Sequence, residues 1–126
     1  MAGTAAIIFT VIMAGLAVFQ LALALGAPLG HFAWGGQHKV LPRGLRIGSL
    51  FSIVLYGLFS AIVMKRSGLL APWPNAGWIG PATGVLVAYL GLGIVMNAIS
   101  RSRPERLTMT PLVAVLCALT LVVALS

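Results

Sequence analysis

Two histidines, His31 and His38, are the first residues in this chain whose type and spacing could carry chemistry. They lie seven apart in one polar segment, HFAWGGQHKVLPRGLR, residues 31–46. A zinc site needs further His, Cys or carboxylate ligands at short spacing, and a b-type haem needs axial ligands that converge from opposite sides. The single cysteine, Cys117, falls inside a distant apolar stretch. We therefore predict no metal site and no cofactor.

A second polar segment, NAISRSRPER at 97–106, places three arginines around the only acidic residue, Glu105. Guanidinium groups offer forked donors that suit a phosphate or a lipid headgroup. The alternative is charge that sets topology plus one exposed Glu105–Arg pair of little energetic weight. Together the two segments form what we call the ligand face, which comprises His31, Trp34, Gln37, His38, Arg43, Arg46, Asn97, Ser100, Arg101, Arg103, Glu105 and Arg106.

The 31–46 segment can also be read as a turn between two membrane helices. Its His and Trp side chains are amphipathic and suit the headgroup level, and paired glycines give the turn conformational freedom. Helix–helix connections are usually about 2–8 residues long, so this one is long for a turn alone. The sequence leaves the two interpretations open.

The composition decides which elements must position these residues. The chain has 126 residues, of which 60% are hydrophobic and 7% charged, against about 25% charged in soluble domains. A helix that spans the hydrocarbon core needs about 20 apolar residues. Four stretches without Lys, Arg, Asp or Glu meet this need: 1–38, 47–64, 67–100 and 107–126. We predict one all-α domain, 1–126, a compact polytopic bundle with four spans at about 5–25, 45–64, 78–99 and 107–125.

The predicted ends of these spans follow from glycine and proline. Gly26 and Gly68 should end the first and second spans, because glycine accepts a left-handed cap. The pair Thr110-Pro111 resembles a capping threonine followed by proline at the first helical position. The last span is therefore expected to begin near Leu107 or at Thr110.

The acidic content excludes many enzymes. With one Glu and no Asp, the chain has no carboxylate pair for acid–base work, no Ser-His-Asp relay and no acidic magnesium site. We predict no catalytic residues. An enzyme acting on a lipid or quinone through His31 or His38 is kept as a third alternative.

The basic residues predict the orientation. The first and third connections carry six of them, and the second connection carries two, Lys65 and Arg66. Because basic loops stay in the cytoplasm, both termini should lie outside. The net charge of +7 is explained in this way without nucleic acid, and it favours contact with anionic lipid headgroups.

Small residues recur at helical spacing and form a candidate packing face. It comprises Gly44, Gly48, Ser52 and Tyr56 in the second span and Gly80, Gly84 and Gly91 in the third. Small residues let helices approach closely, within one chain or between copies. The alternative is that the hydroxyl-bearing members line a pocket or pore.

Two motifs carry a resemblance to known proteins. They are W-G-G-Q-H-x-x-L-P-x-x-L-R at 34–46 and N-x-x-S-R-S-x-x-E-R at 97–106. The chain resembles a functionally uncharacterised family of small bacterial four-helix integral membrane proteins. The resemblance implies the fold and a multi-pass location in the bacterial cytoplasmic (inner) membrane, and it implies no activity.

Three functions remain open from the sequence. The first is a non-catalytic binding or accessory component of the membrane, which would pack against a partner protein or a second copy. The second is a homo-oligomeric transporter or channel for a small solute or ion. The third is the lipid or quinone enzyme named above.

Overall fold

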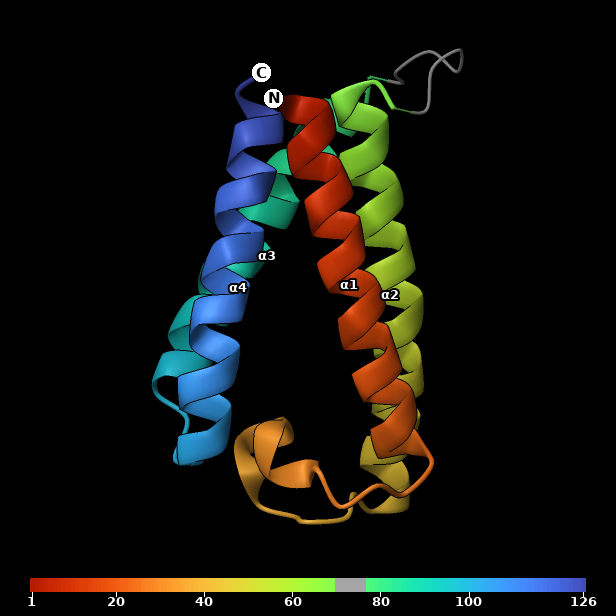
Figure 1. The fold of residues 1–126 in the computed structure, drawn as a ribbon, viewed down its shortest axis with the longest axis vertical. Coiled ribbons are helices and arrows are strands. Elements are labelled where there is room, and N and C mark those ends of the chain that lie inside the picture. The colour runs from red at the N-terminus through yellow and green to blue at the C-terminus, as the bar shows by residue number, and fades with distance from the viewer. Residues whose placement is uncertain (70–76) are drawn as a thin grey trace.

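Four long α-helices make up most of the described chain. The computed structural model describes residues 1–69 and 77–126, and no strand occurs in these ranges (Figure 1). The helices are α1 (Ala2–Ala24), α2 (Arg43–Ser67), α3 (Ile79–Ala98) and α4 (Arg103–Ala124), and two 3-10 turns, η1 (Gly30–Phe32) and η2 (Trp34–Gly36), lie between α1 and α2. Each α-helix is long and apolar enough to cross a membrane. The predicted all-α class with four possible spans is confirmed.

Glycine ends the first two helices, as predicted. Gly68 is the C-terminal cap of α2 and adopts φ +90°, and its N–H donates to the carbonyl of Lys65. Gly26 follows α1 with φ +96°. Left-handed backbone of this kind is costly for residues with a side chain, so a glycine is the residue that permits each stop.

The prediction for the start of α4 is wrong. The helix begins at Arg103, with Pro104 in its first turn, and it runs through Pro111 without interruption. Pro104 already has the φ that a first turn requires and has no N–H to leave unpaired. Thr110 caps nothing, and its buried hydroxyl makes no hydrogen bond among the described residues. Pro111 removes one backbone bond from the helix, and the apolar turns on either side of it remain helical.

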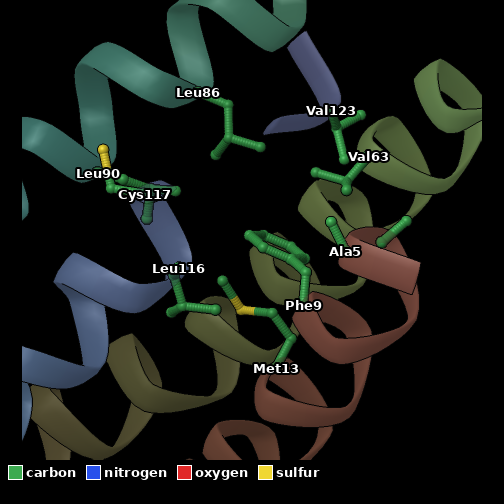
Figure 2. Close-up of a cluster of buried hydrophobic side chains, with 10 residues drawn as sticks. Ala5, Phe9, Met13, Val63, Leu86, Leu90, Leu116, Cys117 and Val123 are labelled. Carbon is green, nitrogen blue, oxygen red and sulfur yellow. The ribbon is translucent and has the colours of Figure 1, made fainter. Parts of the chain in front are cut away.

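The four helices are arranged as two hairpins that meet at one end. Figure 1 shows α1 beside α2 and α3 beside α4, with both termini at the same end of the bundle. At that end a buried cluster joins all four helices, and Figure 2 shows Phe9, Val63, Leu86, Leu116 and Val123 within it. At the other end the hairpins diverge, and the connection between α1 and α2 lies between them.

This connection, residues 25–42, is packed and not a free linker. Leu23, Ala33 and Leu41 form a second buried cluster, against which Phe19 and Leu45 also pack. The N–H of Gly30 donates to the carbonyl of Lys39 over 2.8 Å, which closes the connection on itself. The segment therefore covers the open end of the bundle from a fixed position.

The predicted packing face divides into two parts. A Cβ built on Gly48 would lie 2.9 Å from Cη2 of Trp34, so this glycine does permit a close approach, to the connection between α1 and α2. Around Gly44 of α2 and around Gly80, Gly84 and Gly91 of α3, no other part of the described chain, apart from the adjoining residues and backbone of the same helix, lies within 4 Å of such a Cβ. The glycine face of α3 therefore points away from the bundle.

Candidate functional site

Two neighbouring cavities lie between the hairpins at the divergent end. Their volumes are about 290 and 460 Å³, close to the lower end of the range for small-molecule sites, about 300–1,000 Å³. Residues from all four α-helices and from η2 line both cavities: Leu16, Trp34, Tyr56, Tyr89, Asn97 and Val113. The smaller cavity is the more polar of the two, because it adds Gln20, Ser52 and Glu105.

The cover of this site is held in a strained conformation. Trp34 has φ +53° and is the only non-glycine residue with positive φ in the described chain, and Gly35 (+78°) and Gly36 (+71°) continue the left-handed run. Left-handed backbone costs about 1–2 kcal/mol for a residue with a side chain. Contacts of the indole offset this cost. Its ring lies against Gly48, and its Nε1–H donates to Oγ of Ser49 over 3.2 Å.

The same turn is fastened to the start of α4. The Gly35 N–H donates to Oε2 of Glu105 over 3.1 Å, and the Ser102 hydroxyl donates to the carbonyl of His31. A Cβ on Gly36 would overlap the side chain of Ser102. The structure thus brings the two polar segments of the sequence together. It does so mainly through the loop backbone, because the His31 ring itself faces the carbonyl of Gly36.

The environment of Glu105 differs from the expected one. Its side chain is only 6% exposed. Among the described residues, no Lys, Arg or His side-chain nitrogen lies within 4.0 Å of its carboxylate oxygens, so it forms no ion pair. The expected exposed Glu105–Arg pair is therefore wrong. Arg106 turns instead to the backbone and donates from Nη1 to the carbonyl of Ser100 over 3.1 Å.

The spacing of Ser102 and Glu105 carries a signal that marks the start of α4. Ser-x-x-Glu at a helix start is a capping box, in which each side chain bonds the other residue's backbone N–H. In α4 neither side chain caps the helix. Both contact the η1–η2 turn instead. Because the capping box is not formed, both side chains are available to the turn, and the carboxylate of Glu105 becomes part of the cavity wall.

Polar groups from three helices complete the wall. Gln20 is 8% exposed, and its Nε2 donates to the hydroxyl of Tyr56 over 3.1 Å. Its Oε1 is buried and has no hydrogen-bond partner among the described residues. Ser52 and Asn97 donate to backbone carbonyls of their own helices, over 3.0 and 2.8 Å. A buried acceptor left unpaired is costly, and Gln20, which carries this acceptor, is part of the cavity wall.

The remaining members of the ligand face lie elsewhere. Only Trp34, Asn97 and Glu105 of that set line the two cavities. Arg46 donates to the carbonyl of Leu41 over 2.8 Å, and Ser100 is buried and accepts the N–H of Ser102. The others are exposed on the surface of this end: His31, Gln37, His38, Arg43, Arg101 and Arg103.

The cavity also includes residues outside the predicted ligand face. Gln20 and Tyr89 belong to neither predicted set, and Ser52 and Tyr56 were assigned to the packing face. Polar residues within apolar spans were the available signal, because they are costly in lipid and mark functional sites. Among the described residues, no three His, Cys, Asp or Glu side chains lie together in a way that could hold a metal ion.

No protein-family model matches this chain, and no curated protein and no solved structure matches it either. The fold and the site alone therefore define the class of this protein. This is an all-α protein with four helices able to cross a membrane and with a polar cavity between its two hairpins.

Proposed function

We propose that this chain is a non-catalytic binding protein of the membrane, which holds a small ligand between its two helical hairpins. The observation that carries the proposal is the unpaired Oε1 of Gln20 beside a cavity that also contains the buried Glu105. Polar groups inside a membrane protein are expensive and usually face a partner or a pathway. A ligand in the cavity would supply the missing partner.

The basic end of the bundle supports a second part of the proposal, contact with anionic lipid. The α1–α2 connection and the α3–α4 connection lie at the same end of the bundle, and six of the eight Lys and Arg residues lie in or next to them. Each basic residue near an anionic leaflet gains about 1 kcal/mol. We propose that this end faces the cytoplasmic leaflet of a bacterial inner membrane, with both termini outside. A homodimer or a partner protein would then cover the glycine face of α3.

The binding proposal can be tested through what the protein retains on purification. Wild type in mild detergent should carry a non-lipid compound, seen by native mass spectrometry, or bind one from a panel of small amphipathic probes. Ser52→Phe places a ring in the cavity and should abolish retention. Val54→Phe is the matched control, because Val54 is 67% exposed and outside the cavity. Equal retention by Ser52→Phe, or no compound and no probe bound by wild type, would contradict the proposal.

Transport is the second candidate function, and one observation favours it. The buried cluster closes the bundle at the end that carries the termini, and the cavities lie toward the opposite end. A site closed on one side corresponds to one state of an alternating-access cycle. Four helices rarely enclose a path alone, so transport would need two or more copies. Counterflow of the retained compound in proteoliposomes would separate a transporter from a binding protein that shows none.

A further inference from the structure

The groups that line the cavity point to the chemical class of the ligand. We propose that it is a protonated primary or secondary amine with an apolar, preferably aromatic, body. Its ammonium group would lie at Glu105 and Gln20, and its body would extend into the larger cavity. This inference rests on the proposed function, since it names the ligand of the same site.

The first argument is a count of donors and acceptors in the smaller cavity. The Ser52 hydroxyl proton is committed to the carbonyl of Gly48, and one amide proton of Asn97 to that of Gly93. The indole N–H of Trp34 is committed to Ser49. The hydroxyl protons of Tyr56 and Tyr89 and one amide proton of Asn97 stay available as donors, and the oxygens of Ser52, Asn97 and Glu105 stay available as acceptors. Among these acceptors is the only carboxyl group of the cavity wall, that of Glu105. An ammonium group is the complementary partner, because it carries up to three donors and no acceptor.

The second argument concerns charge. Glu105 is the only acid in the chain, it is buried, and no cation pairs with it among the described residues. Its Oε2 accepts one backbone N–H, from Gly35, which satisfies part of the carboxylate and fixes its position. A buried carboxylate is stable only when it is paired and hydrogen-bonded. A cationic ligand would provide the pairing that the chain itself does not provide.

The third argument concerns the walls of the larger cavity. Trp34, Tyr56, Phe59 and Tyr89 all line it, and the rings of Phe59 and Tyr89 lie 5.4 Å apart at 54°. Aromatic faces attract cations and also pack against apolar bodies. Leu92 and Met96 of α3, both more than half exposed, line the same cavity. They give it an apolar side through which a ligand dissolved in lipid could approach.

The basic end of the bundle opposes a cation, and the burial of the charged groups decides the outcome. Arg46 and Arg106 are directed to backbone carbonyls, and Arg101 and Arg103 are exposed. Exposed charges are screened by salt and solvent, with a screening length of about 10 Å at about 0.1 M ionic strength. A contact between an ammonium group and a buried carboxylate is screened much less. The buried carboxylate therefore outweighs the arginines, which are bonded to backbone carbonyls or exposed to solvent.

The test uses four phenyl compounds of similar size and equilibrium dialysis against the full chain in nanodiscs of neutral lipid. The compounds are 2-phenylethylamine, its trimethylammonium analogue, 3-phenylpropanol and 3-phenylpropionate, and empty nanodiscs correct for partitioning. We expect saturable binding of the amine at least about tenfold tighter than that of the alcohol, a factor that corresponds to about 1.4 kcal/mol. The trimethylammonium analogue should bind more weakly than the amine, because it has no N–H donors. The carboxylate should show no saturable binding.

Variants assign the preference to named groups. Glu105→Gln should remove the advantage of the amine over the alcohol, and Glu105→Asp should keep most of it. Ser52→Ala should lower the affinity for the amine, because it removes an acceptor oxygen from the cavity wall. Thr83→Ala is the matched control and should leave this affinity unchanged. Both hydroxyls donate to the carbonyl four residues earlier, but Thr83 lies outside both cavities. The ratio of amine to alcohol binding is measured within each variant, so a general loss of stability does not imitate the result.

The outcomes separate this inference from the function on which it rests. If the alcohol, the propionate or the trimethylammonium compound binds saturably and as tightly as the amine, the amine class is wrong and the cavity remains a binding site. An unchanged amine preference in Glu105→Gln would also overturn the inference. If none of the four compounds binds saturably and wild type retains no compound on purification, the binding function itself fails.

Discussion

The backbone amide of Gly35 reports whether the η1–η2 turn is docked on α4, and Gly36→Ala should undock it. Both Gly35 and Gly36 have positive φ, so alanine at either position costs about 1–2 kcal/mol in backbone strain. They differ in their surroundings. A Cβ at 35 meets no atom within 4 Å among the described residues, whereas a Cβ at 36 overlaps Ser102. In Gly36→Ala, overpacking against Ser102 adds about 1–3 kcal/mol. This cost destabilises only the docked state of the turn.

Hydrogen exchange measures this difference directly. The amide at position 35 is protected when it donates to Glu105, and it exchanges through opening of the turn. An extra 1–3 kcal/mol corresponds to about 5- to 150-fold faster exchange in Gly36→Ala than in Gly35→Ala. The assay is NMR exchange on the full chain in detergent micelles. Equal acceleration in the two variants would refute the argument, because it would show that Ser102 exerts no constraint on the turn.

Two further predictions concern the placement of the bundle and its glycines. In a background that lacks Cys117, Gln37→Cys should not react with a membrane-impermeant maleimide added to intact cells, whereas Ser126→Cys should react. The six-to-two distribution of basic residues predicts this result. The reverse labelling pattern would show that the opposite topology is correct. Gly48→Leu should lower the unfolding free energy by about 1–3 kcal/mol by overpacking against the Trp34 ring, whereas Gly84→Leu should change it by no more than about 0.5 kcal/mol, as at open positions. Denaturation in mixed micelles measures both, and equal losses would show that Gly84 is also packed.

The fold could be predicted from the sequence because its strongest signals are local. Four uncharged stretches of sufficient length give four helices, and glycines mark where the first two end. The start of α4 was missed because two prolines compete for the same role. Pro104 stands two residues after Ser102, which has extended backbone suited to a cap and Glu105 three residues later, whereas Pro111 directly follows Thr110, which has Val113 at that position. The capping-box spacing of Ser102 and Glu105 was the local signal that favoured Pro104.

The site was only partly predictable, because it depends on contacts between distant segments. The two polar segments were expected to share one end of the bundle, and the bond from Gly35 to Glu105 spans 70 positions in the chain. The histidines attracted attention by residue type, yet His38 is exposed and the ring of His31 faces the loop backbone. The groups that line the cavity are ordinary span residues. Their convergence depends on the divergence of the two hairpins, which no local pattern encodes.

The central claim is that the space between the hairpins is a ligand site, and the two tyrosines of the chain allow a direct measurement. Tyr56 and Tyr89 are the only tyrosines, and both line both cavities. Protein labelled with 3-fluorotyrosine therefore gives two ¹⁹F resonances, each assigned by a Tyr→Phe variant. Titration with the retained compound, or with each of the four phenyl compounds in turn, should shift both resonances along one saturable curve with a shared Kd for at least one of them. Resonances that do not move, or that drift linearly with the amount of compound in the bilayer, would contradict the claim.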